Sequence, residues 1–147
     1  MSIISLYAKW IREGKLKVDS SWNTEGLKFT VQDPCNLVRK GLGDSVADDL
    51  RFTIKACAGE ENFVDTWPNK SNNFCCGGGG GAHQSGFKDK KLLYGKIKFD
   101  QVIATKADVV ITPCHNCHAQ LEQICDKYKG NYHTYHLWNL IMKALVR

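Results

Sequence analysis

Residues 107–112, ADVVIT, constrain the fold more than any other part of the chain. Their apolar side chains follow one another without the strict alternation of a half-exposed strand, which is typical of strands buried inside parallel sheets. The run ends at Pro113-Cys114, so the chain leaves the sheet just before a cysteine. This segment predicts a central strand with a chemically reactive residue at its carboxyl end.

Strands and helices are predicted to alternate along the chain. Further strands are expected at residues 27–31, before Asp33-Pro34-Cys35, and at residues 132–136, and residues 73–76 are interpreted as another strand end. Residues 60–73 are interpreted as a loop or a weak strand. Apolar residues at helical spacing predict helices at residues 2–15, from an N-cap at Asp44 through Cys57, at 88–105 with a break near Gly95, at 118–128 and at 137–146.

This alternation predicts an α/β fold, a three-layer Rossmann-like domain with a mainly parallel sheet and helices on both faces. The length of 147 residues suits one compact domain. Within it, residues 1–26 are expected to form an N-terminal helix and connector, and residues 27–147 the cysteine-rich α/β domain. We expect no secretory signal, because residues 1–7 contain two serines and lead into a charged segment.

The seven cysteines are many for this length, and their number is odd. A secreted disulfide scaffold would have evenly paired cysteines, and the adjacent Cys75 and Cys76 pair poorly with each other. We therefore expect reduced thiols in a cytoplasmic protein. Cys57 and Cys125 lie on apolar helix faces and are expected to be core residues.

The other five cysteines all follow predicted strand ends, in segments far apart in the sequence. In parallel α/β sheets the functional site lies outside the carboxyl ends of the strands. The sequence therefore predicts that these thiols meet at one edge of the sheet. The five are Cys35, Cys75, Cys76, Cys114 and Cys117.

Five converging thiols favour an iron-sulfur cluster, since a zinc ion takes four ligands, usually from two well-spaced pairs. Gly77, Gly78 and Gly79 fit this cofactor, because a loop without Cβ atoms approaches a bulky core closely and directs N–H groups at negative charge. A flexible loop without a ligand and a phosphate-binding loop are the alternatives for these glycines. A zinc-binding structural or interaction module, and cluster-free thiol redox chemistry at Cys114 and Cys117, remain alternatives for the whole chain.

The net charge of +5 comes mainly from lysines, with clusters at residues 12–17 and 88–98. We interpret both clusters as solvated helix faces and expect no nucleic-acid partner, because no recognisable nucleic-acid motif accompanies them. His115 and His118 flank the CxxC motif and, like His83 beside the glycines, are candidates to tune a cofactor or move protons. No stretch approaches the roughly 20 apolar residues of a membrane span.

Three motifs together resemble a known family. Asp33-Pro34-Cys35, residues 74–78 (FCCGG) and residues 112–117 (TPCHNC) are similar to the cysteine-rich CCG domain of heterodisulfide reductases and their relatives. The resemblance covers the chain from about residue 27 onward. It is nearest to the catalytic iron-sulfur subunit of the sulfite-reduction-associated membrane complex, which itself resembles the heterodisulfide reductase D subunit.

The resemblance implies a non-cubane [4Fe-4S] cluster with the five cysteines as ligands, at which a disulfide or trisulfide is cleaved or formed. It further implies an electron-donating iron-sulfur module as partner, a thiol, a disulfide or a small sulfur-carrier protein as substrate, and possible docking to a membrane complex. Larger relatives carry a CxxCxxC module or a second CCG repeat, and this sequence contains neither. We therefore expect a fragment or a subunit of a heterodisulfide-reductase-like oxidoreductase.

Overall fold

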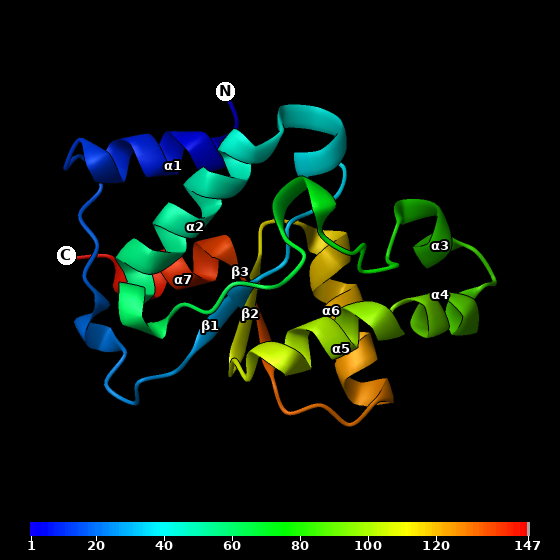
Figure 1. Ribbon diagram of the computed structural model, residues 1–147. Helices are drawn as coiled ribbons and strands as arrows, with labels where there is room; N and C mark the ends of the chain where they lie inside the picture. The colour runs from blue at the N-terminus through cyan, green and yellow to red at the C-terminus, as the bar shows by residue number, and fades with distance from the viewer. Residues whose placement is uncertain (147) are drawn as a thin grey trace.

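The computed structural model describes residues 1–146 and has an α/β architecture (Figure 1). Short 3₁₀ turns lie at Ser20–Trp22, Glu60–Asn62 and Lys70–Asn72, and a π-helical turn at Val38–Leu42. The main elements are α1 (Ile3–Arg12), β1 (Phe29–Val31), α2 (Asp44–Ala58), α3 (Gly80–Gln84), α4 (Lys88–Tyr94), α5 (Lys96–Thr105), β2 (Val109–Thr112), α6 (His115–Lys127), β3 (His133–His136) and α7 (Leu137–Ala144).

The sheet contains three parallel strands in the order β1-β2-β3. In the central strand, Val109 and Ile111 face one side, whereas Val110 faces the other. All four residues of β2 are buried, as expected for a strand covered on both faces. The predicted central strand and the parallel sheet are confirmed.

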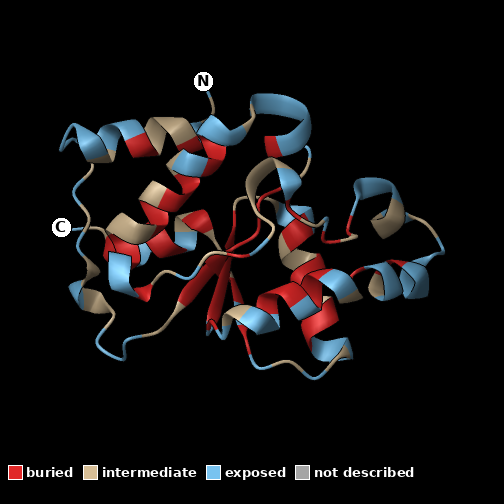
Figure 2. Ribbon diagram, in the orientation of Figure 1, coloured by how far each residue is buried: buried red, intermediate tan, exposed pale blue. Residues whose placement is uncertain are grey.

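Helices cover both faces of this sheet (Figures 1 and 2). On one face, α1, α2 and α7 enclose the larger core around Val109 and Ile111. On the other face, α5 and α6 form a smaller core around Val110. The predicted three layers are therefore present, and Figure 2 shows the buried residues concentrated in the strands and on the helix faces toward them.

Several predicted elements need correction. Residues 73–76 do not form a strand. In the segment before them, interpreted as a loop or a weak strand, Phe63 forms an isolated parallel bridge with Phe29 of β1. Asp44 is not the N-cap but the first residue of α2, because Gly43 occupies the N-cap position, and the Asp44 carboxylate accepts from the backbone N–H of Ser71. The break near Gly95 is confirmed, since it separates α4 from α5.

The N-terminal segment shares the larger core. Ile4 of α1 belongs to it, and Trp22 in the connector packs against it and donates from its ring N–H to the carbonyl of Cys57 at 2.7 Å. The boundary at residue 26 remains a prediction. Across residues 1–146, no helix has the length and the apolar composition that crossing a bilayer requires.

Candidate functional site

Five cysteines line a single cavity near the carboxyl ends of β1 and β2. They come from three segments that are distant in sequence, and a proline, two asparagines and three glycines complete the wall. The predicted convergence of the thiols is therefore present. The lining residues are Pro34, Cys35, Asn36, Cys75, Cys76, Gly78, Gly79, Gly80, Cys114, Asn116 and Cys117.

The sulfur atoms approach one another closely in this cavity. Cys76 Sγ lies 3.3 Å from Cys117 Sγ, and Cys35 Sγ lies 3.9 Å from Cys75 Sγ. Cys76 and Cys117 are buried, whereas Cys75 is exposed. The cavity thus has an inner sulfur pair and an outer sulfur that solutes can reach.

The segment that carries Cys35 continues directly from β1. The backbone N–H of Gln32, just after β1, donates to the carbonyl oxygen of Ile111 in β2 at 2.9 Å. Strand pairing therefore fixes the backbone up to the residue before the buried Asp33. A turn follows, in which the carbonyl of Pro34 accepts from the N–H of Val38 at 2.9 Å. This turn places Cys35 at the rim of the cavity.

The segment that carries Cys75 and Cys76 is held by side chains rather than by a strand. Arg39 donates to the carbonyl of Ser71 at 2.8 Å and also to that of Asn73. The Lys98 ammonium donates to Oδ1 of Asn73 at 2.6 Å. These contacts fix residues 71–73 from both sides and so position the two adjacent cysteines.

The glycines behind them point backbone N–H groups at sulfur. Gly77, with φ of +82°, donates to Cys75 Sγ at 3.4 Å, and Gly78 donates to Cys76 Sγ at 3.4 Å. A Cβ on Gly78 would lie 2.6 Å from Cβ of Gln120, so only glycine fits there. Gly79 has open space around it, and Gly80 already begins α3, which the sequence did not predict.

The CxxC motif lies at the start of α6. Cys114 is the N-cap residue and Cys117 lies in the first turn, so the helix begins at His115 and not at residue 118 as predicted. The chain leaves β2 at Thr112, whose hydroxyl accepts from the N–H of Cys114 at 3.3 Å. A strand end and a helix start therefore hold this cysteine pair rigidly.

The thiols share protons unequally. A hydrogen bond with the Cys117 thiol lowers the pKa of Cys76 to about 3, and another lowers the pKa of Cys114 to about 6. The pKa of Cys117 is raised by its hydrogen bonds to Cys114 and Cys76, and the pKa of Cys75 is raised chiefly by its hydrogen bond with Cys76. The lowered pKa values make Cys76 and Cys114 the cavity thiols that lose their protons most readily.

Comparison with known proteins agrees with this geometry. The family model described as "CCG: Cysteine-rich domain" matches residues 29–122, which is well over half of the chain and includes all five cavity cysteines. The chain belongs to this CCG family. CCG domains are typical of heterodisulfide-reductase-like iron-sulfur proteins. A search of curated proteins finds no match to the chain.

A buried lysine lies behind the cysteine cavity of this CCG domain. Lys98 is fully buried, and its ammonium donates to Asn73 and Gln101. Burial lowers the pKa of Lys98 to about 7, against the opposing effect of negative charge on Asp33, Cys76 and Cys117.

The interpretation of residues 88–98 as a solvated face was therefore wrong for Lys98, and also for Lys91, which is 4% exposed. Both side chains turn inward, while Leu93 and Ile97 remain exposed. A sequence signal for Lys98 did exist, because it lies four residues before the buried Val102 and so shares its helix face.

The histidines lie around the site rather than in it. His115 is exposed and is absent from the cavity lining, and its ring stacks parallel to that of His136 at 5.9 Å. His118 stacks on the same His136 ring at 4.2 Å. His83 contacts the site differently: its Nε2 lies 3.1 Å from the carbonyl oxygen of Asn116. None of them forms a hydrogen bond with a cysteine sulfur within residues 1–146, and a role in proton movement stays a prediction.

The remaining cysteines, Cys57 and Cys125, are buried in the two cores, as predicted. Within the described residues, no group of three or more His, Cys, Asp or Glu side chains is arranged to hold one metal ion.

Proposed function

We propose that this CCG domain binds an iron-sulfur cluster of the non-cubane [4Fe-4S] type through Cys35, Cys75, Cys76, Cys114 and Cys117. The observation that carries the proposal is the single cavity lined by these five thiols from three distant segments. Thiolates are the protein ligands of such clusters, and the lowered pKa values of Cys76 and Cys114 supply two of them. The N–H groups of Gly77 and Gly78 already point at ligand sulfur.

We further propose that the domain takes part in electron transfer and in the reductive cleavage or the formation of a disulfide or trisulfide. A cluster of this kind supplies one-electron chemistry at an iron that accepts sulfur. The protein's contribution is the shape of the cavity. Buried Cys76 and Cys117 keep the inner side dry, while exposed Cys75 marks the side from which a sulfur substrate enters.

The proposed setting is a heterodisulfide-reductase-like complex in the cytoplasm that docks to a membrane complex. We propose that the electrons come from a partner iron-sulfur module. The substrate would be a thiol, a disulfide or a small sulfur-carrier protein. All seven cysteines are free, which supports a reducing compartment.

Cluster-free thiol chemistry is the second candidate, and one observation favours it. Cys114 caps α6 and its pKa is lowered to about 6, so it is a thiolate at neutral pH beside a second thiol. This function would require Cys114 and Cys117 but would not require Cys35.

Cysteine substitutions with matched controls test both candidates. After anaerobic reconstitution with iron and sulfide, Cys35→Ala and Cys117→Ala are expected to lose most of the visible absorption and the bound iron. Cys57→Ala and Cys125→Ala, outside the cavity, are expected to retain both. Equal iron in all four variants would contradict the proposed ligand set. Disulfide-reducing activity that survives Cys35→Ala in iron-free protein would support the second candidate.

A further inference from the structure

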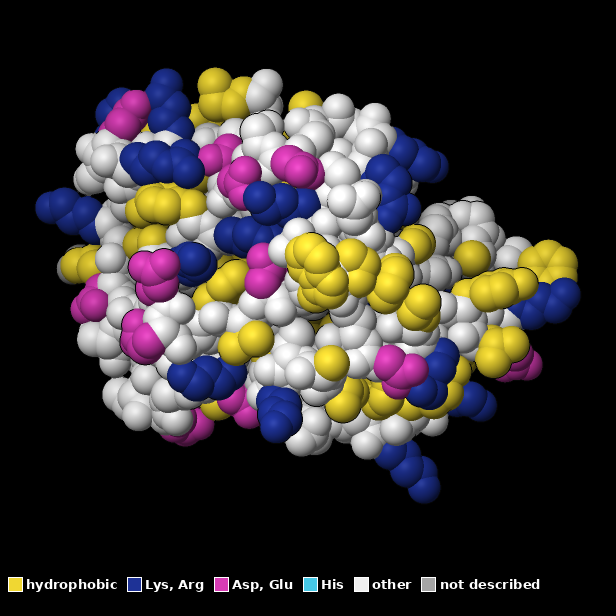
Figure 3. Space-filling view, in the orientation of Figure 1, with side chains coloured by type: hydrophobic (Ala, Val, Ile, Leu, Met, Phe, Trp, Pro, Cys, Tyr) yellow, Lys and Arg dark blue, Asp and Glu magenta, His cyan; other side chains and the backbone are white. Residues whose placement is uncertain are grey.

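Helix α3 forms part of the wall of the cysteine cavity. Its first residue, Gly80, and the preceding Gly79 line the cavity together with the cysteines. The inner cysteines, Cys76 and Cys117, are only 3% and 4% exposed. Figures 1 and 3 show α3 and α4 on a part of the molecule that projects from the main body. A small projecting element therefore helps to separate the inner sulfur atoms from solvent.

Packing gives α3 little support. The helix has five residues, none of them is buried, and no side chain caps its first turn. A Cβ on Gly79 or Gly81 would meet nothing within 4 Å, so the backbone of these glycines lies in open space. Glycine loses more conformational freedom on ordering than any other residue. Specific contacts must therefore hold this segment in place.

His83 makes every hydrogen bond that joins residues 79–86 to another helix within the described residues 1–146. The other hydrogen bonds of this segment stay local, such as the bond from the hydroxyl of Ser85 to the carbonyl of Ala82. His83 Nδ1 lies 2.8 Å from Lys91 Nζ of α4, and Nε2 lies 3.1 Å from the carbonyl oxygen of Asn116 in α6. One imidazole ring thus links three helices.

The two contacts fix the tautomer of the His83 ring. The Lys91 ammonium has donor hydrogens and no acceptor, so Nδ1 of His83 accepts. Nε2 then carries the ring hydrogen and donates to the carbonyl of Asn116. Lys91 is only 4% exposed, so its bond to the imidazole is shielded from water and is stronger than a surface contact. A neutral His83 ring therefore satisfies both neighbours at once.

Both partners of His83 belong to the surroundings of the cysteine site. Asn116 lies within the CxxC motif and lines the cavity. The backbone carbonyl of Lys91 accepts from Nε2 of Gln120, also in α6, at 2.9 Å. A Cβ on Gly78 would lie 2.9 Å from His83 Nε2, so the ring packs directly against the glycine wall of the cavity. His83 therefore joins α3 to the frame that carries the cysteines.

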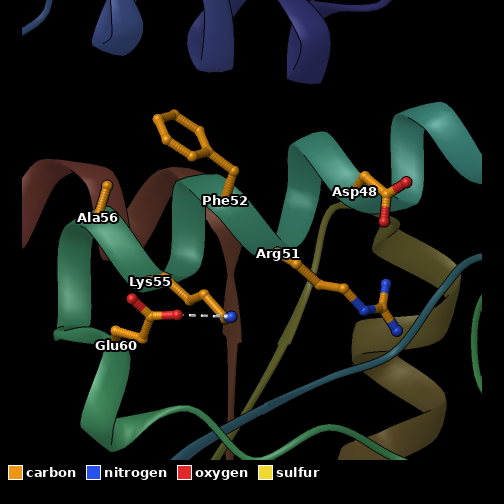
Figure 4. Close-up of a pocket in the computed structure, with 6 residues that line it drawn as sticks. All are labelled: Asp48, Arg51, Phe52, Lys55, Ala56 and Glu60. Atoms are coloured by element: carbon orange, nitrogen blue, oxygen red, sulfur yellow. Dashed lines mark hydrogen bonds and ion pairs between the residues drawn. The ribbon is translucent and has the colours of Figure 1, made fainter.

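The exposed turn that follows α2 is held differently (Figure 4). Glu60 there pairs with Lys55 at 3.2 Å, and Nδ2 of Asn62 donates to the carbonyl of Ala58 at 2.9 Å. The N–H of Val64 also donates to β1 at 2.8 Å. Loss of one contact leaves that turn with the others. In contrast, α3 has no second side chain that hydrogen-bonds to a neighbouring helix within the described residues.

We propose that His83 is a positioning residue that latches α3 over the cysteine cavity and so limits access to the sulfur atoms of Cys76 and Cys117. The proposal rests on the proposed function, which gives these two sulfur atoms their role. With both hydrogen bonds of His83 made, α3 is closed on the cavity. Without them, α3 moves about Gly79 and Gly81, and reagents in solution reach the inner thiols.

Cysteine alkylation of the full chain, reduced and free of metal, tests this latch. Iodoacetamide is added without denaturant, and peptide mass spectrometry follows the initial rate at each cysteine. His83→Ala is expected to raise the rates at Cys76 and Cys117 at least about tenfold, since two hydrogen bonds are lost and one of them is charge-assisted. The rates at Cys57 and Cys125, in the two cores, are expected to stay unchanged and so exclude general unfolding.

Three further variants separate positioning from a general loss of structure. His133→Ala, at an exposed histidine of β3, is the matched control and is expected to leave all rates unchanged. His83→Gln is expected to restore most of the protection, because its amide can accept from Lys91 and donate to the Asn116 carbonyl. Lys91→Met is expected to raise the same two rates, and to add nothing when it is combined with His83→Ala.

The proposal is overturned if His83→Ala leaves Cys76 and Cys117 as protected as they are in the wild type. Equal increases at Cys57 and Cys125, or a His83→Gln protein that reacts like His83→Ala, would also overturn it. Every measurement uses metal-free protein, so failure of the latch is distinguishable from failure to assemble a cluster.

Discussion

Arg51 donates to both carboxylate oxygens of Asp33, from Nη1 to Oδ1 at 2.8 Å and from Nη2 to Oδ2 at 2.9 Å. Both residues are buried. Oδ2 of Asp33 also accepts the backbone N–H of Lys70 at 2.8 Å. Asp33 stands two residues before Cys35, and Lys70 lies on the segment that leads to Cys75, so one buried carboxylate ties two cysteine-bearing segments to α2.

Arg51→Leu is predicted to destabilise the fold strongly. It leaves the Asp33 carboxylate buried without its cation, which costs about 3–5 kcal/mol in unfolding free energy. Arg12→Leu is the matched control, because its ion pair with Asp49 lies at the surface and is worth at most about 1 kcal/mol. Urea denaturation of both variants measures the difference. Equal midpoints would show that the buried pair does not organise these segments.

Gly78→Ala is predicted to disturb the cavity wall. The new Cβ would lie 2.6 Å from Cβ of Gln120 and 3.0 Å from the carbonyl oxygen of Asn116, so the wall must shift at a cost of about 1–3 kcal/mol. Gly79→Ala meets nothing within 4 Å and is expected to cost less than about 1 kcal/mol. The urea midpoint and the iron content after reconstitution should both fall in Gly78→Ala, and neither should fall in Gly79→Ala. A Gly78→Ala protein as stable as Gly79→Ala would contradict the close packing.

The sequence could predict the parts of this fold that depend on local periodicity. The run at residues 107–112 is apolar enough to identify the central strand and its end before Cys114, and residues 27–31 identify the strand that ends before Cys35. The meeting of the thiols could be inferred because parallel strands end at one edge of a sheet.

The position of Cys75 and Cys76 in the cavity could not be predicted from strand periodicity. They reach the cavity without a strand, through contacts of Arg39 and Lys98 with residues 71–73. Such contacts join residues 25 to 34 positions apart and leave no periodic signal. Lys98 does share a helix face with the buried Val102, but a lysine on a helix is ordinarily exposed, and its buried partner Asn73 lies 25 positions away in the sequence.

Lys98→Met is predicted to lower the reduction potential of the reconstituted protein. A buried positive charge near the cavity favours the more negatively charged, reduced state, so its removal shifts the potential downward by an amount on the order of tens of millivolts. A redox titration followed by visible absorption measures the shift. Lys127→Met, at an exposed position on α6, is the control, and an equal potential in both variants would show that Lys98 does not act on the cofactor.

The lowered pKa of Lys98 predicts that the stability of the cluster-free, reduced protein depends on pH. Its pKa is lowered to about 7 by burial, whereas an unfolded lysine titrates near 10.4, so between these values the unfolded state holds the extra proton. The penalty for burying the charge is complete below pH 7 and is relieved as the pH rises. The unfolding free energy of the wild-type protein relative to Lys98→Met should therefore increase by about 2 kcal/mol from pH 7 to pH 9. A flat difference in urea denaturation across that interval would contradict the burial of a charged lysine.

The content of iron and acid-labile sulfide in freshly prepared anaerobic protein is the most direct test that the five thiols hold one cluster. The account predicts about four irons and four sulfides per chain, with both lost together in Cys117→Ala. Protein that contains one zinc without sulfide, or that remains free of metal after reconstitution while correctly folded, would contradict it.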